Sequence, residues 1–262
     1  MDAMNVVVCV KQIPDPAQPG KLSDGSHTLV REGKLILDES DSYGVEMALQ
    51  LVTAAGGGEV TLVSMAPNGE VSGLRTALAM GAAKAVLVSD EALAGTDALG
   101  TAKVLAAAIK RIEPNLIIAA TESTDGYTGT TPVQLAELLG LPSVSFAKSI
   151  ETDGSTAKVS RQTEAGSDDV ECPLPAVVTV TAGVVEPRYP SFKGIMAAKG
   201  KPVEQLTVAD LGLSADQVGA HGSRQEIVSV TPAEERKAGE KVVDEGDAYQ
   251  KIVSFLDELK VI

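Results

Sequence analysis

The sequence predicts an α/β protein with a doubly wound, mostly parallel sheet, an antiparallel extension and a C-terminal arm. Two observations predict this class. Runs of β-branched residues alternate with segments of helical spacing over the first half of the chain. Only 3% of the residues are aromatic, so Val, Ala, Leu and Ile have to fill the core, and that composition suits buried parallel strands. A length of 262 residues fits one main core with appendages.

The expected elements of this sheet follow one another along the chain. A strand over residues 5–10 leads into a hairpin over residues 28–37, which turns at Glu32 and Gly33. Helices and strands then alternate, and Thr96 is the expected cap of the third helix. The expected strands cover residues 60–63, 85–88, 116–119 and 143–146. The first three expected helices are recognised by apolar stripes, which are Val45, Ala48, Leu49 and Val52, then Val71, Leu74 and Leu78, then Leu105, Ala108, Ile109 and Ile112. A fourth helix is expected over residues 131–140.

The alternation of strands and helices stops after residue 147. Residues 157–166 and 169–183 look like strands with no helix between them, which predicts the antiparallel extension. A short capped turn is expected over residues 207–212. From about Gly222 a polar spacer leads to an apolar helix with the stripe Tyr249, Ile252, Val253 and Leu259. A short isolated helix is marginal in water, so this arm has to dock on its own domain or on another chain, and we favour another chain.

Net charge excludes several classes of partner. A formal charge of −14 argues against general nucleic-acid binding and against binding to anionic membranes, because like charges repel. No run of about 18 apolar residues is present, and the N-terminal apolar run follows an acidic rather than a basic residue. We therefore expect neither membrane insertion nor a secretory signal, and the cytoplasm is the predicted location.

Few side chains are available for catalysis or for metal binding. Cys9 and Cys172 lie far apart without CxxC spacing, which argues against a disulfide or zinc site and predicts two buried thiols. His27 and His221 fall in the expected hairpin and tail, which argues against a Ser-His-Asp arrangement. Neither GxxxxGK[ST] nor GxGxxG is present. We predict no catalytic residue and no metal site.

One loop on the expected sheet has the composition of a ligand site. Residues 121–132, TESTDGYTGTTP, follow the fourth strand, are rich in hydroxyl groups and glycine, and lead directly into a helix. In a doubly wound sheet, ligands lie at the carboxyl ends of strands, where a helix N-terminus offers free amides to a phosphate. Small polar residues are equally common in strand-to-helix loops that bind nothing. Both interpretations stay open on the residues alone.

Several longer motifs resemble those of one family. They are VCVKQIPD near the N-terminus, LRTALAMGA at 74–82, ESTDGYTGTTP in the loop just described, CPLPAVVTV, and above all EPRYPSFKGIMAAKGK. Over nearly its whole length the chain resembles the β subunits of electron-transfer flavoproteins, in a form similar to actinobacterial members. The resemblance implies a fold of the adenine-nucleotide α-hydrolase type and an α subunit partner that holds most of the contacts to FAD. Such a dimer takes electrons from dehydrogenases, such as those of acyl-CoA oxidation, and passes them to a membrane quinone oxidoreductase.

The resemblance also implies a structural AMP in the sheet and a set of residues around it. It places Cys9, Val10 and Lys11 near the base by backbone contacts and Asp38, Ser64 and Met65 along the pocket, with Asp125, Gly126, Thr128, Gly129, Thr130 and Thr131 around the ribose and phosphate. Some relatives bind a second FAD here and bifurcate electrons. Their loop reads Asp-Gly-Asp-Thr-Ala-Gln, whereas this chain has Tyr127 and Thr130 in place of the second Asp and the Gln, so AMP is favoured.

A partner-recognition segment is the third implication of the resemblance. An exposed ring flanked by polar groups is typical of an interaction site, and Phe192 resembles the family's inserted apolar anchor. The segment's expected partner-binding residues are Glu186, Arg188, Tyr189, Phe192, Ile195, Met196, Lys199 and Lys201. The alternative is that Phe192 packs on its own domain. The implied organisation is a nucleotide-binding α/β domain over residues 1–183, the recognition segment over 184–205, and a C-terminal segment and arm over 206–262 that docks on the α subunit.

Two other classes of protein share this type of sheet. A stress-type nucleotide-binding protein forms homodimers and carries no flavin, but such proteins are usually much shorter. A small-molecule hydrolase or adenylating enzyme would need a phosphate motif and a reactive nucleophile, and the sequence contains neither.

Overall fold

A computed structural model of the chain describes residues 3–231, 239 and 241–262. The chain divides into two units, Met1–Ile227 and Val228–Ile262, and each is described by itself.

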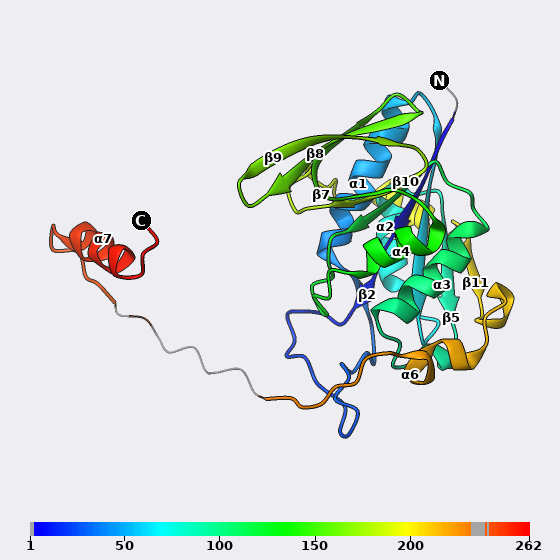
Figure 1. Ribbon diagram of the computed structural model, residues 1–262, viewed down its shortest axis with the longest axis horizontal. Coiled ribbons are helices and arrows are strands. Elements are labelled where there is room, and N and C mark those ends of the chain that lie inside the picture. Colours follow the sequence, from blue (N-terminus) through cyan, green and yellow to red (C-terminus); the bar gives the residue numbers. More distant parts are fainter. Residues whose placement is uncertain (1–2, 232–238, 240) are drawn as a thin grey trace. The chain divides into compact units, whose positions relative to one another are not determined.

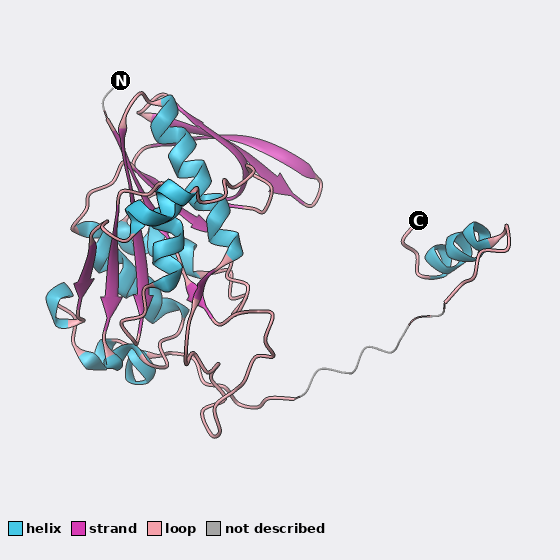
Figure 2. Cartoon of the chain, turned by 180° about the vertical axis from the view of Figure 1, so that it is seen from behind, coloured by secondary structure: helices cyan, strands magenta, loops and turns pink. Residues whose placement is uncertain are grey.

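Strands of the first unit form one large sheet (Figure 1). Among the described residues it has nine strands, in the order β11 (Val203–Leu206), β5 (Lys84–Ser89), β4 (Gly58–Ala66), β1 (Met4–Cys9), β6 (Leu116–Ala120), β10 (Ala176–Val180), β7 (Ser143–Thr152), β8 (Thr156–Thr163) and β9 (Gly166–Pro173). Pairing is parallel from β11 to β7 and antiparallel from β7 to β9. The β8–β9 end of the sheet extends beyond the helices (Figure 2).

Helices cover both faces of this sheet. Side chains alternate between the faces along β1, so Val6 and Val8 pack in one core with α1 (Glu39–Ala54) and α2 (Ser72–Met80). Val7 packs in a second core with α3 (Ala98–Lys110) and α4 (Thr131–Leu139). The aliphatic side chains of both cores are almost fully buried. The predicted doubly wound, mostly parallel sheet with an antiparallel extension is therefore confirmed.

The predicted hairpin over residues 28–37 is wrong. The structure instead pairs β2 (Gln12–Ile13) with β3 (Ile36–Leu37) in a small antiparallel ladder, and a single bridge joins Leu22 to Leu29. The buried side chain of Gln12 explains the pairing, because its oxygen accepts the N–H groups of Gly73 and Leu74 at 2.9 and 3.3 Å. The start of α2 thus fixes β2, and β3 aligns along it.

The predicted N-cap of α3, Thr96, is wrong by one residue. Asp97, and not Thr96, accepts the N–H of Gly100, at 2.7 Å. The hydroxyl of Thr96 donates to the carbonyl of Leu93 and accepts the N–H of Gly219. A carboxylate is a strong acceptor for the free N–H groups at a helix start, which favours Asp97.

Residues 169–183 do not form one antiparallel strand. β9 ends at Pro173, and β10 then enters the centre of the sheet, parallel to β6 and to β7. A run of apolar β-branched residues is compatible with either direction, and the five residues of β10 are buried on both faces, as parallel strands are. β7 is also longer than predicted, because it continues past residue 146 into the pairing with β8.

The segment after β10 packs on the first unit. α5 (Phe192–Ala198) is a short helix within the predicted recognition segment, and β11 pairs with β5 at the sheet edge. The predicted capped turn over residues 207–212 is confirmed, since Asp210 accepts from the backbone and hydroxyl of Thr207. The remaining short turns are η1 (Glu91–Leu93), η2 (Ala209–Leu211), η3 (Ala215–Gln217) and α6 (Gly219–Gly222). By the division into units, the part of the chain that holds the predicted arm begins at Val228.

The second unit contains α7 (Ala248–Glu258), which is the predicted C-terminal helix. Its stripe of Tyr249, Ile252, Val253 and Leu259 is more than half exposed, so the described residues of this unit do not cover it. Part of the predicted spacer, residues 232–238 and 240, lies outside the described residues. Within the described part of the chain, no helix is long and apolar enough to cross a membrane.

Candidate functional site

Two loops meet at the carboxyl ends of the central strands. β1 and β6 are parallel neighbours, with Cys9 opposite Ala119. The connections that follow them turn to opposite faces of the sheet, since α1 covers one face and α4 the other. This is the switch point of a doubly wound sheet, the place where such proteins bind ligands.

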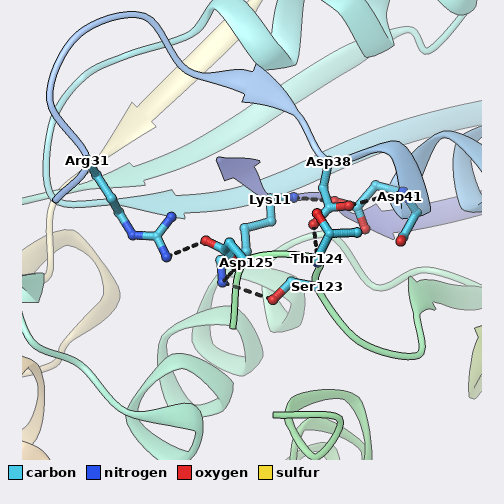
Figure 3. Close-up of polar contacts among 8 residues, drawn as sticks. Lys11, Arg31, Asp38, Asp41, Ser123, Thr124 and Asp125 are labelled. Carbon is cyan, nitrogen blue, oxygen red and sulfur yellow. Dashed lines mark hydrogen bonds and ion pairs between the residues drawn. The ribbon is translucent and has the colours of Figure 1, made fainter. Parts of the chain in front are cut away.

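Lys11 and Asp125 join these loops (Figure 3). The ammonium group of Lys11 donates to a carboxylate oxygen of Asp125 at 2.6 Å and to the hydroxyl of Ser123 at 3.1 Å. Arg31 contacts the other carboxylate oxygen of Asp125 at 2.5 Å. The resemblance placed Lys11 and Asp125 in one expected site, and the structure brings their side chains into contact. Sequence reasoning missed Arg31, because that residue reaches the site from a long irregular loop that the sequence interpreted as a hairpin.

Asp125 stays ionised at neutral pH in this setting. Its side chain is only 6% exposed, and burial alone would raise its pKa. The Lys11 ammonium and the Arg31 guanidinium oppose burial and hold the pKa of Asp125 below its usual value. The loop is therefore fixed by one carboxylate between two cations.

Asp38 and Asp41 brace the same loops from the start of α1. Asp38 is fully buried, and its carboxylate accepts the N–H of Thr124 at 2.8 Å and the N–H of Ser40 at 3.0 Å. Asp41 accepts the backbone N–H of Lys11 at 2.5 Å. Burial raises the pKa of Asp41 well above its usual range, against the bond from Lys11. Asp38, which was predicted to line a pocket, thus connects the start of α1 to the loop after β6, and sequence reasoning missed Asp41 altogether.

The ends of β1 and β4 supply the floor of the site. The backbone N–H of Val10 donates to the carbonyl of Val63, so it is not free for a ligand. Desolvation, with the Asp41 carboxylate second, raises the pKa of the half-buried Cys9 thiol to about 12, so the thiol stays protonated. Ser64 is completely buried, and its hydroxyl has no hydrogen-bond partner among the described residues. Met65 follows it and is half-buried.

The start of α4 closes the site from the other side. The N-cap residue Thr130 makes no side-chain bond to the helix, so the first N–H groups of α4 have no capping acceptor from it. Gly129 has a φ of 64°, a left-handed conformation that favours glycine. The side-chain oxygen of Gln134, in the same first turn, is buried and unpaired among the described residues. Of the other loop residues predicted for a nucleotide, Thr131 begins α4, and Gly126 and Thr128 lie in the loop before it.

This arrangement fits an anionic nucleotide. The unpaired hydroxyl of Ser64 points to a missing hydrogen-bond partner, since buried polar groups are nearly always paired. The uncapped start of α4 suits a phosphate, and the two cations Lys11 and Arg31 outnumber the single Asp125 carboxylate that they bind. Among the described residues no cluster of His, Cys, Asp or Glu could hold a metal ion.

Two cavities of the described structure lie at the opposite, amino-terminal edge of the sheet. One of about 320 Å³ is bordered by Lys84, Glu59, Arg111 and Glu204, which already form ion pairs of 2.5 and 3.5 Å with one another. The other is an open, mainly apolar groove between the ends of α3 and α4. Neither contains a residue of the predicted nucleotide site.

The predicted recognition segment presents an apolar surface on α5. Tyr189 is 93% exposed and Phe192 80%, and Ile195 and Met196 are about half exposed. Phe192, Ile195 and Met196 share one side of the helix, because they are three and four residues apart. We refer to these four side chains as the α5 patch.

Two basic residues of this segment are engaged within the chain. Arg188 binds Glu46 of α1 through two nitrogens, at 2.6 and 2.9 Å. The ammonium group of Lys201 donates to the carbonyls of Leu78 and Ala82, at 2.9 and 2.6 Å. Glu186 and Lys199 are exposed, as a contact with a partner requires. The sequence alone could not distinguish these two kinds of charged residue.

Comparisons with known proteins agree on one family. Residues 26–211 match the family described as "Electron transfer flavoprotein domain". The chain is 42% identical to "Electron transfer flavoprotein subunit beta" of Mycobacterium leprae, over 98% of this chain and 99% of that protein. It is 34% identical to the protein of the same name from Thermoanaerobacterium thermosaccharolyticum, over 99% of this chain and 100% of the relative. It is 33% identical, over the same shares, to "Caffeyl-CoA reductase-Etf complex subunit CarD" of Acetobacterium woodii.

The alignments cover nearly the full length of this chain and of its relatives, so the similarity includes the recognition segment and the arm as well as the sheet. By this identity and coverage, the chain belongs to the family of electron transfer flavoprotein β subunits.

Proposed function

We propose that the chain is the β subunit of a heterodimeric electron carrier. Its α subunit partner makes most of the contacts to FAD. The dimer accepts electrons from acyl-CoA and related dehydrogenases and delivers them to a membrane quinone oxidoreductase. The observation that carries the proposal is the α5 patch, where Tyr189 and Phe192 are almost fully exposed in a chain with only seven aromatic residues. Large exposed rings are typical of a docking surface.

The nucleotide in our proposal is AMP, bound at the switch point. Ser64 and the first turn of α4 offer unsatisfied hydrogen-bonding groups there, and Lys11 and Arg31 supply positive charge. The role of AMP would be structural, because its site is built from residues that brace the two loops. Bound flavin supplies the electron chemistry of the dimer, and the residues of this chain position and enclose it from the β side.

A second candidate is a bifurcating flavoprotein with a further FAD in place of AMP. The likeness to a subunit of a caffeyl-CoA reductase complex favours this possibility. The loop composition opposes it, because Tyr127 and Thr130 stand where the second-FAD pattern has Asp and Gln. Tyr127 is also 66% exposed in a left-handed conformation, with a φ of 49°.

The lone chain is expected to purify without flavin. The full chain and the αβ complex would be expressed separately, denatured, and assayed for released flavin and adenine nucleotide. We expect yellow colour and one FAD only in the complex, and AMP in the denatured extract. Stoichiometric FAD on the lone chain would contradict the AMP assignment and favour the bifurcating alternative.

Replacing both Thr130 and Thr131 with Val tests the phosphate site. The exchange keeps the branched shape and removes two hydroxyl donors, each worth about 1 kcal/mol or more when bound to a charged group. We expect less AMP in extracts of the αβ complex and weaker assembly with the α subunit. The control is Thr53→Val, an exposed residue at the far end of α1. Unchanged nucleotide content would mean that the two hydroxyls serve only the helix start.

A further inference from the structure

Side chains of α2 and of the segment after α5 bind the backbone carbonyls at each other's helix ends. A guanidinium nitrogen of Arg75, on α2, donates to the carbonyls of Ala198 and Lys201, at 2.6 and 2.7 Å. In return the Lys201 ammonium donates to the carbonyls of Leu78 and Ala82 at the end of α2. Cations at helix C-termini satisfy unpaired carbonyls and oppose the helix dipole. The end of α5 therefore depends on a side chain of α2, and the end of α2 depends on Lys201, three residues after α5.

A glycine sets the separation between these helices. A Cβ atom on Gly194 would lie only 2.4 Å from the backbone oxygen of Ala79, so any larger residue would push α5 away from α2. Ser191 caps the N-terminus of α5 by accepting the N–H of Gly194 at 3.0 Å. The backbone of α5 is thus fixed on α2 by direct contact as well as by the exchanged caps.

An ion pair fixes the chain just before α5. Glu46, on α1, is 3% exposed and accepts two bonds from the guanidinium of Arg188 and one from the side chain of Gln50 at 2.9 Å. Burial alone would raise the pKa of Glu46, but the bonds from Arg188 lower it below its usual value, so the pair is ionised at neutral pH. A bidentate pair constrains direction as well as distance.

We propose that Arg75, Arg188 and Lys201 are positioning residues for partner docking, which hold the α5 patch in its binding conformation without contacting the partner. This inference rests on the proposed function, because it assigns roles within the same docking surface. It reassigns Arg188 and Lys201, which the sequence grouped with the residues that contact the partner.

Preorganisation is the physical benefit of this arrangement. An exposed patch on a loose loop loses conformational freedom when it binds, and each immobilised side chain weakens the complex. The backbone of α5 has already lost that freedom in the free protein, because contacts with α1 and α2 hold it in place. Affinity for the partner therefore depends on side chains beneath the patch as well as on the patch.

Glu46→Gln separates positioning from direct contact. Glu46 is too buried to touch a partner, so this variant and Arg188→Met should have the same effect if Arg188 acts through Glu46. In steady-state transfer from a purified medium-chain acyl-CoA dehydrogenase and its acyl-CoA, we expect each variant αβ complex to raise the KM for the carrier about three- to tenfold, with kcat unchanged. Arg75→Met and Gly194→Ala should do the same. Hydrogen exchange of the amides at 192–199 should accelerate in all four.

Three further variants complete the design. Arg111→Met is the matched control, because Arg111 also donates to a backbone carbonyl, that of Asp210 at 3.1 Å, which lies outside α5. Arg75→Lys and Arg188→Lys keep the charge, and they replace Arg75→Met and Arg188→Met if those variants fail to fold. Arg188→Lys should recover only part of the KM, since one ammonium group cannot make the bidentate pair.

The outcomes distinguish this inference from the proposed function. If Phe192→Ala raises the KM but the four variants do not, the positioning roles are wrong and the docking surface stands. If Phe192→Ala itself leaves the KM unchanged, the proposed function is wrong. If Arg188→Met raises the KM and Glu46→Gln does not, Arg188 contacts the partner directly. Unchanged exchange at 192–199 in all four variants would also contradict the inference.

Discussion

Phe192→Ala in the αβ complex is expected to slow reduction by a partner dehydrogenase about ten- to a hundredfold at sub-saturating carrier, because burying a Phe in a partner's pocket contributes about 1.5 to 3 kcal/mol. The melting temperature, the flavin spectrum and the AMP content should hardly change, since the ring is 80% exposed in the free chain and supports little of its core. The measurement is steady-state transfer as a function of carrier concentration, run beside a melting curve of the same complex.

Two variants serve as controls for the Phe192 experiment. Phe192→Leu keeps an apolar side chain and should recover most of the rate. Lys199→Ala removes an exposed charge beside the patch and should alter mainly the association rate and its salt dependence. Lys201 is unsuitable for that purpose because it caps α2. If Phe192→Ala melts markedly lower and transfers normally once corrected for the folded fraction, the ring belongs to the core and the docking proposal fails.

Truncation after Ile227 is expected to lower the affinity for the α subunit by about a hundredfold or more, because several apolar side chains of α7 would lose their cover at about 1.5 to 3 kcal/mol each. The described residues of the arm leave the stripe of Tyr249, Ile252, Val253 and Leu259 exposed, and the first unit has its own two cores. Circular dichroism of the truncated chain should therefore keep its amplitude and melting temperature while a pull-down with the α subunit fails.

A charge on one side or the other of α7 tests the same point in the full chain. Ile252→Asp places a carboxylate in the apolar stripe and should weaken binding of the α subunit nearly as much as truncation. Lys251→Asp places the same group on the polar side and should have little effect. Equal effects of the two variants would mean that α7 does not dock by its stripe, and unfolding of the truncated chain by itself would assign the arm to the core.

Local patterns predicted most of the sheet. The β-branched runs of β1, β4, β5 and β6 and the helical spacing of α1 to α4 are local signals, and the structure confirms them. Such signals could not predict the position of β10 in the sheet, because the sequence of an apolar strand does not indicate whether its neighbours run parallel or antiparallel to it. The hairpin over 28–37 was wrong for a related reason, since the partner of β3 is β2, which lies more than 20 residues earlier in the chain.

The part of the candidate site that lies just after two neighbouring parallel strands was predictable from the sequence. Lys11 and Asp125 follow β1 and β6, and strands of a parallel sheet end at one edge, so their proximity follows from the topology. Arg31 was missed because an irregular loop brings it there. Arg188 and Lys201 were assigned to a partner because a positive charge in a sequence does not reveal whether its counterpart lies within the same chain. Only the three-dimensional arrangement separates the two cases.

The position of β10 has a consequence for how the chain folds during synthesis. β10 lies between β6 and β7 in the sheet, yet it is made after both of them and after β8 and β9. A nascent chain that ends before residue 176 leaves β6 and β7 without the strand that joins them, so two apolar strand edges are open to other chains. Completion of the sheet has to wait for this late, long-range pairing, which makes folding slower and exposes the chain to aggregation on the ribosome. Chaperone demand during translation should therefore be highest before β10 emerges and fall once it is inserted.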